Sequence, residues 1–103
     1  MIIKFNNDYL EALYQGEDLK GKPKYNAVII RKFIKTINNL SVIDNISELR
    51  KFNSLNFEAL KGDLAGFYSV RVDYHYRLIL SLEKEEITIK DIIIIEDLTN
   101  HYQ

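Results

Sequence analysis

The sequence predicts an α+β domain in which helices pack on one face of an antiparallel sheet. In residues 25–40, apolar side chains recur every three to four positions, which is the period of a helix with one buried face. From Leu55 onward the period changes to two, and polar residues interrupt the pattern as hairpin turns do. Helices followed by a meander of strands are typical of the α+β class.

The first half of the chain is expected to hold one short strand and two helices. Residues 2–5 are apolar and β-prone enough for an edge strand, and Asn7 offers a cap for a helix that ends near Tyr14. Pro23 suits the first turn of a second helix. The predicted buried stripe of that helix consists of Tyr25, Ile29, Phe33, Ile37 and Leu40. A short helical turn is expected near Ser47.

The second half is expected to form a hairpin and one further strand. Residues 67–72 and 76–81 alternate around a turn at Asp73. Residues 87–95 contain the longest apolar run and are expected to form the most buried strand.

Two arginines of the predicted hairpin fall on one face. Side chains alternate across a strand, so Ser69, Arg71 and Arg77 are expected on the face away from the helices. Arg71 and Arg77 are therefore expected to converge on the open side of the sheet. A solvated sheet face with no function is the plainer interpretation of the same pattern.

Length and composition fit one globular domain spanning residues 1–103. The absence of cysteine excludes a disulfide framework and a thiolate nucleophile, and two histidines are a poor supply of metal ligands. We therefore predict no metal site and no cofactor. No signal peptide or membrane span is expected, which makes the cytoplasm the expected location.

Charge is unevenly distributed along a chain of net charge −1. Residues 50–77 carry five Lys or Arg against three Asp or Glu, whereas residues 78–103 carry two against six. This distribution predicts a local basic site and excludes a generally basic, nucleic-acid-binding surface.

Three spaced motifs give the chain a recognisable signature. Residues 60–72 read L-K-G-D-L-A-G-F-Y-S-V-R-V, residues 76–78 read Y-R-L, and residues 96–102 read E-D-L-T-N-H-Y. This pattern resembles the HigB-like toxins of the RelE/ParE superfamily, the plasmid maintenance killer group. The resemblance implies a RelE/ParE-like fold, with an N-terminal strand, two helices on one face of an antiparallel sheet and a short C-terminal helical tail.

The resemblance also implies a type II toxin–antitoxin system toxin that cleaves mRNA on the ribosome without a metal. In such a reaction the 2′-hydroxyl attacks the neighbouring phosphate and leaves a 2′,3′-cyclic phosphate. The resemblance implies that the catalytic residues are Lys61, Arg77 and His101. The supporting or RNA-binding residues are Arg71, Glu58, Asp97 and Tyr102. Glu58 stands where family members often carry histidine, and Lys61 also fits an ordinary surface turn.

The partners that the resemblance implies are a HigA-like helix-turn-helix antitoxin and the ribosome with mRNA in its decoding site. Operator DNA would be contacted only through the antitoxin, and no membrane is involved. Two other functions remain open. A ParE-like toxin of the same fold would poison gyrase without cleaving RNA. A degenerate toxin would serve only as a co-repressor of its antitoxin.

Overall fold

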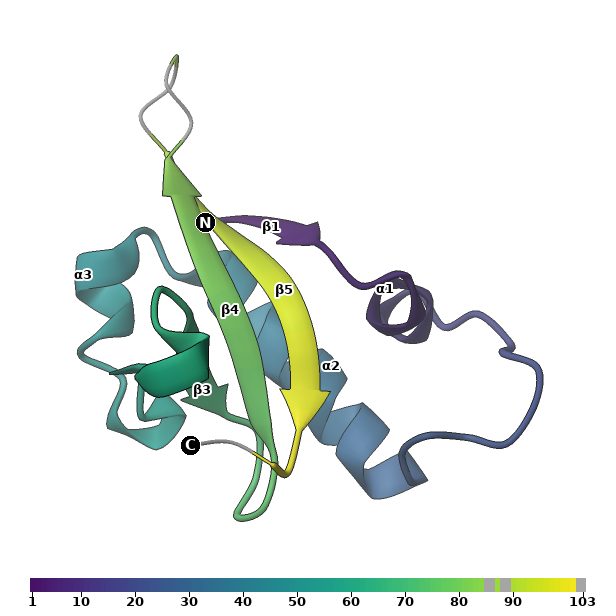
Figure 1. Cartoon of the computed structure of the whole chain (residues 1–103). Coiled ribbons are helices and arrows are strands. Elements are labelled where there is room, and N and C mark those ends of the chain that lie inside the picture. The colour runs from purple at the N-terminus through teal and green to yellow at the C-terminus, as the bar shows by residue number, and fades with distance from the viewer. Residues whose placement is uncertain (85–86, 88–89, 102–103) are drawn as a thin grey trace.

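A five-stranded sheet lies at the centre of the molecule, with its strands in the order β1-β5-β4-β3-β2 (Figure 1). The structure, a computed structural model, describes residues 1–84, 87 and 90–101. The strands are β1 (Ile2–Phe5), β2 (Glu58–Ala59), β3 (Tyr68–Arg71), β4 (Arg77–Lys84) and β5 (Asp91–Thr99). The helical elements are α1 (Asp8–Tyr14), α2 (Ala27–Val42), α3 (Ile46–Leu49) and the 3₁₀ turns η1 (Asn53–Leu55) and η2 (Gly62–Leu64). No helix in this described part is long and apolar enough to cross a membrane.

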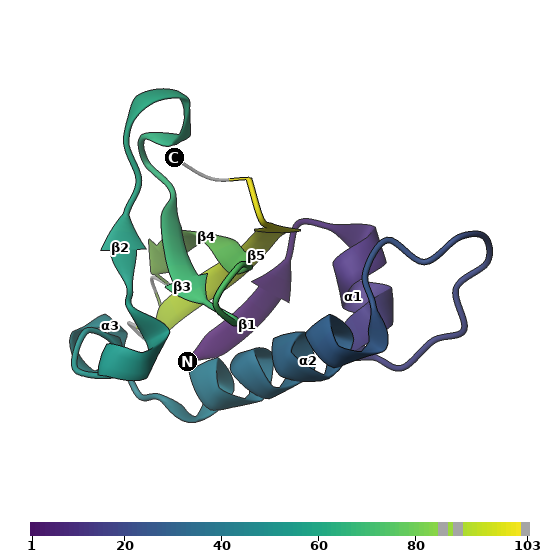
Figure 2. The same cartoon turned by 90° about the horizontal axis from the view of Figure 1, so that it is seen from below.

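The predicted α+β class is confirmed, because α2 packs across one face of the sheet. Figure 2 shows α2 on one side of the strands and the loop between β2 and β3 projecting on the other. The layer between helix and sheet is apolar, as the two sequence periods predict. Its fully buried side chains include Phe33, Ile37, Leu40, Leu78, Leu80, Ile93 and Ile95.

Asparagine side chains cap the starts of α1 and α2. Asn7 accepts a hydrogen bond of 3.1 Å from the backbone N–H of Leu10, which confirms the predicted cap of α1. Asn26 accepts one of 2.9 Å from the N–H of Ile29. This cap starts α2 after Asn26, so the predicted start at Pro23 is wrong. Pro23 lies in the preceding loop.

The sheet is mixed, which corrects the prediction of an antiparallel one. β1 pairs parallel with β5, placing Ile2 opposite Ile92 and Phe5 opposite Ile95. The other strand pairs are antiparallel. Alternating hydrophobicity reports which face of a strand is buried, but it carries no information on the direction of the neighbouring strand.

β5 begins and ends four residues later than the strand predicted at residues 87–95. Ile87, the first residue of the predicted strand, lies outside β5 and is 93% exposed. The apolar run in the sequence therefore does not mark where the strand begins, because the limits of a strand are set by backbone pairing. At its far end, Thr99 pairs with Arg77. The predicted C-terminal helical tail is therefore wrong for the residues described up to His101.

A β-bulge interrupts the β4–β5 ladder. The register shifts between Ile79 and Leu80, and Glu96 is the extra residue. The carboxylate of Glu96 accepts hydrogen bonds from Ser81 Oγ at 2.5 Å and from Asn6 Nδ2 at 2.8 Å. The bulge thus fixes a carboxylate on the open face of the sheet and links β1, β4 and β5 there.

Candidate active site

The guanidinium of Arg77 is buried on the face of the sheet opposite α2. Val70 and Leu78 belong to the core, so their strand neighbours Ser69 and Arg77 face the other side. Arg77 is only 3% exposed, and its Nη2 donates to the hydroxyl of Ser69 at 2.7 Å. The face was predicted correctly, but the burial of Arg77 contradicts the alternative interpretation of a solvated sheet face at this residue.

Asn56 covers Arg77 from the loop before β2. Its φ of +44° is left-handed, a conformation that asparagine tolerates better than most residues. Its carbonyl accepts a hydrogen bond of 2.6 Å from Arg77 Nη2. Its side-chain Nδ2 donates one of 3.1 Å to Glu58 Oε1. One strained residue therefore holds both the guanidinium and the neighbouring carboxylate.

Glu58 is the exposed member of this group. β2 pairs with β3 so that Glu58 lies opposite Ser69. Its Oε2 is 4.0 Å from Arg77 Nη2, and its side chain is 51% exposed. This group thus joins a buried cation to a solvent-accessible carboxylate. We call it the Arg77 cluster, and it consists of Arg77, Ser69, Asn56 and Glu58.

Lys61 is exposed on the loop that leads from β2 to β3. Its carbonyl accepts from the N–H of Leu64 at 3.3 Å, and Gly62 follows with a φ of +63°. This geometry agrees with an ordinary surface turn, and it leaves the ammonium of Lys61 accessible three residues after Glu58.

The end of β5 lies beside Arg77 in the sheet. Thr99 pairs with Arg77 across β4 and β5, and its hydroxyl accepts a hydrogen bond of 2.9 Å from the N–H of His101. His101 and Asp97 are exposed. Tyr102 lies outside the described residues. The described part contains no group of three or more His, Cys, Asp or Glu side chains placed to bind a metal ion.

Tyr25 contacts the end of β5 and the residue that precedes β4. Its hydroxyl donates a hydrogen bond of 2.7 Å to the carbonyl of Leu98. Its ring meets Tyr76 edge-on at 6.0 Å and Tyr9 at 6.3 Å. Burial, followed by the charge of Asp97, raises the pKa of Tyr25 to about 12. Tyr25 was predicted on the α2 stripe, but it precedes that helix.

Arg71 lies apart from the Arg77 cluster in its surroundings. Its backbone pairs with that of Arg77, yet it is exposed and lines a cavity of about 220 Å³ with Lys32 and Lys35 of α2. Lys61 and Arg77 are not among the residues that line this cavity. Arg71 and Arg77 are thus register partners, as the hairpin predicted, but Arg71 is exposed whereas Arg77 is buried.

Sequence reasoning missed the roles of three residues. Asn56 had one detectable signal, since asparagine between two apolar residues is a common left-handed turn residue. Ser69 was placed on the correct face without a partner. Tyr25 gave no signal, because a tyrosine on an apolar stripe looks like core.

Comparison with known proteins places the chain in a recognisable group. A model of the family described as RelE-like toxin of type II toxin–antitoxin system HigB matches residues 3–94. An uncharacterized protein of Haemophilus influenzae is 30% identical over 83 residues, covering 81% of this chain and 80% of that protein.

Solved structures share the fold. A YoeB/ParE toxin from Agrobacterium tumefaciens has a TM-score of 0.55 at 19% identity, covering 99% of this chain and 100% of that one. A YoeB–YefM complex from Staphylococcus aureus has a TM-score of 0.52 at 22% identity, covering 99% and 98% of the two chains. At such identities the likeness concerns the fold alone.

Proposed function

This chain belongs to the HigB family of RelE-like toxins in type II toxin–antitoxin systems, and we propose that it is an endoribonuclease that cleaves mRNA on the ribosome. The proposed site is the Arg77 cluster together with Lys61 and His101. The proposed setting is the cytoplasm, where ribosomes and mRNA meet.

The observation that carries the proposal is the placement of Glu58 beside Arg77. Cleavage through the 2′-hydroxyl of RNA needs a proton acceptor and fixed positive charge near the reacting phosphate. Glu58 offers an accessible carboxylate 4.0 Å from a guanidinium that Ser69 and Asn56 hold in one direction. Groups that are already fixed need no reorganisation as charge develops in the transition state.

In the proposed reaction, Glu58 accepts the proton of the 2′-hydroxyl, and the 2′-oxygen forms a bond to the adjacent phosphorus. The bond from phosphorus to the 5′-oxygen breaks, and His101 donates the proton that this oxygen requires. Lys61, which is exposed near Glu58 in the chain, binds the phosphate. The products are a 2′,3′-cyclic phosphate and a 5′-hydroxyl. DNA lacks the attacking hydroxyl and is not a substrate.

Arg71, Asp97 and Tyr102 have supporting roles in this proposal. Arg71 is an exposed cation suited to a more distant phosphate, and Asp97 adds a negative charge near the end of β5. Tyr102 is proposed to stack on a base, a contact worth about 1–3 kcal/mol in proteins that bind single strands.

The charge of the chain supports the proposal that cleavage depends on the ribosome. The chain has a net charge of −1, and residues 78–103 carry six acidic residues against two basic ones. A protein of this kind holds free RNA poorly by general electrostatics. A ribosome that already grips the mRNA would supply the missing affinity and present the 2′-hydroxyl to a small site.

A proteinaceous antitoxin is the proposed regulator. The YoeB toxin of S. aureus was solved as a complex with YefM, and type II toxins are by definition members of such pairs. We propose a HigA-like helix-turn-helix protein as the antitoxin of this chain. Contact with operator DNA would then occur only through that protein.

The test compares cleavage of one mRNA, naked and on programmed ribosomes, by the wild type and by Glu58→Gln. Cleavage is expected on ribosomes only, and Glu58→Gln is expected to slow it by about 10²–10⁴-fold, the usual contribution of a general base. Glu83→Gln, an exposed glutamate on β4, is the matched control. Equal cleavage of naked RNA would contradict ribosome dependence. Growth arrest with intact mRNA would indicate a gyrase poison instead.

A further inference from the structure

Asn56 has a backbone conformation that favours glycine. Its φ of +44° lies in the left-handed region, where the Cβ atom of other residues crowds the next carbonyl oxygen. Within residues 1–84, 87 and 90–101, Asn56 is the one residue with a positive φ that is not glycine. Strained residues of this kind persist only where the surrounding structure holds them, and they cluster at functional sites. What Asn56 has and glycine lacks is the side-chain amide.

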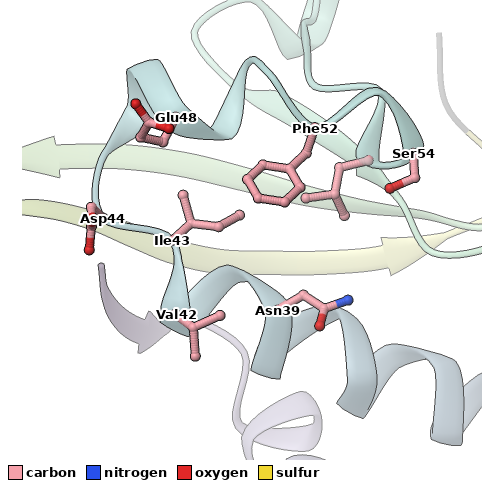
Figure 3. A pocket seen from close by; sticks show the side chains of 8 residues that line it. Asn39, Val42, Ile43, Asp44, Glu48, Phe52 and Ser54 are labelled. Carbon is pink, nitrogen blue, oxygen red and sulfur yellow. The ribbon is translucent and has the colours of Figure 1, made fainter.

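Both chain neighbours of Asn56 are anchored by packing. Leu55, the last residue of η1, is 6% exposed and lines a cavity of about 410 Å³ between the segment from α3 to η1 and the end of α2 (Figure 3). Phe57 stacks on Tyr68 of β3, with ring centroids 5.3 Å apart and planes 7° apart. The guanidinium of Arg50 lies over the ring of Phe57, 5.1 Å from its centroid. The left-handed turn at Asn56 is therefore held from both sides.

The backbone and the side chain of Asn56 contact different partners. Its carbonyl accepts the hydrogen bond of 2.6 Å from Arg77 Nη2, and any residue in this backbone conformation offers that carbonyl. Its Nδ2 donates the hydrogen bond of 3.1 Å to Oε1 of Glu58, and this contact requires the amide. An exposed glutamate without such a donor populates several rotamers. The amide of Asn56 therefore restricts an exposed carboxylate to one orientation.

The hydrogen bond from Asn56 makes the two oxygens of Glu58 different. Oε1 accepts from Asn56, whereas Oε2 lies 4.0 Å from Nη2 of Arg77. We infer that Asn56 is a positioning residue that presents Oε2 of Glu58 to the 2′-hydroxyl of the mRNA, an inference that rests on the proposed function. The proton of that hydroxyl passes to Oε2 as the 2′-oxygen bonds to phosphorus. A proton acceptor must lie about 3 Å from its donor, so a carboxylate that turns away reacts more slowly.

Two substitutions at position 56 separate positioning from folding. Asn56→Gly removes the amide and keeps a residue that tolerates this φ, whereas Asn56→Ala removes the amide and adds strain. Both should slow single-turnover cleavage of ribosome-bound mRNA by the same factor, about 10-fold to 100-fold. The alanine variant should nevertheless unfold at a lower denaturant concentration than the glycine variant. A loss of cleavage that follows stability instead, with only the alanine variant impaired, would overturn the inference.

The nature of the contact is tested by Asn56→Asp, which keeps the shape of the side chain and replaces its donor with an oxygen. The second carboxylate repels that of Glu58, so this variant should cleave more slowly than Asn56→Gly. In both variants, the ribosome concentration that gives the half-maximal rate should remain that of the wild type. Asn45→Gly, on an exposed asparagine that caps α3, is the matched control and should cleave as the wild type does. Wild-type cleavage by Asn56→Asp would show that the donor has no part in the reaction.

A double-mutant cycle tests whether Asn56 acts through Glu58. In a chain that carries Glu58→Ala, the further change Asn56→Gly should cause no additional loss of cleavage, because its effect has no remaining target. An additional loss as large as in the wild type would overturn the inference and mean that Asn56 contacts RNA directly. Slow cleavage by Glu58→Ala with normal cleavage by Asn56→Gly would overturn the inference and leave the proposed function intact. Normal cleavage by Glu58→Ala would overturn the proposed role of Glu58 and the inference together.

Discussion

The Nη2 atom of Arg77 donates a hydrogen bond of 2.7 Å to the hydroxyl of Ser69 on the neighbouring strand. Both residues are shielded from solvent, with exposed fractions of 3% and 0%. The same nitrogen donates to the carbonyl of Asn56, so one guanidinium joins β4 to β3 and to the loop before β2. The stability of the sheet and the geometry of the candidate site therefore depend on the same side chain.

Ser69→Ala should lower the free energy of unfolding by about 1–3 kcal/mol, because it removes an acceptor from a buried charged donor. Arg77→Ala should cost more, since it also leaves Ser69 and the carbonyl of Asn56 without their donor, and it should abolish cleavage. Ser54→Ala, on an exposed serine, is the control. Denaturant unfolding measures the change. Equal stability of all three variants would show that the buried contact contributes nothing.

Tyr25 should make stability depend on alkaline pH. Its pKa is about 12 in the folded chain against about 10 when unfolded, so folding favours the protonated phenol. This contribution is fully present below about pH 10 and is lost as pH rises through about 12. The stability difference between wild type and Tyr25→Phe should therefore shrink across that interval. Denaturant unfolding measured from pH 8 to 12 tests this, and parallel pH profiles would contradict it.

His101→Ala should slow cleavage on ribosomes by about 10²–10⁴-fold if His101 donates the proton to the leaving oxygen. His75 is the matched control, because it is exposed and lies in the β3–β4 turn, where its N–H donates to Asp73. His75→Ala should cleave as the wild type does. Single-turnover cleavage of ribosome-bound mRNA separates the two. Equal rates for both variants would remove His101 from the mechanism.

Removal of transition metals should leave cleavage unchanged. The chain has no cysteine and two histidines, and the proposed chemistry moves protons between side chains and RNA. The measurement uses a chelator selective for transition metals with Mg²⁺ kept constant, because ribosomes require it. Activity that disappears and returns on addition of Zn²⁺ or Mn²⁺ would contradict the metal-independent mechanism.

Local patterns were enough to predict much of the fold. The cap at Asn7, the stripe from Ile29 to Leu40 and the hairpin around Asp73 all depend on residues close in the chain, and all are confirmed. The parallel pairing of β1 and the late end of β5 depend on backbone partners far away in sequence. No local period reports such partners.

The candidate site was less accessible to sequence reasoning. Alternation placed Arg77 on the correct face, yet its burial depends on the left-handed turn at Asn56, which brings another segment over it. Arg71 pairs with Arg77 in register, as the hairpin predicted, but the two residues differ in exposure for a related reason. Arg71 lies at the end of β3, where the cavity beside Lys32 and Lys35 surrounds it. Strand periodicity predicts on which face of the sheet a side chain lies, whereas the burial of Arg77 depends on the loop that contains Asn56.

The pairing of Ile2 with Ile92 joins residues that are ninety positions apart in the chain. β5 lies between β1 and β4 in the sheet, so β1 has no strand partner until β5 has been synthesised. Contacts this distant in sequence form late and slow folding, because the chain between them must be ordered first. A nascent chain therefore lacks the partner of Arg77 at Thr99 until 22 further residues have been synthesised. The topology itself thus delays assembly of the site that is proposed to act on the ribosome, the machine that makes the chain.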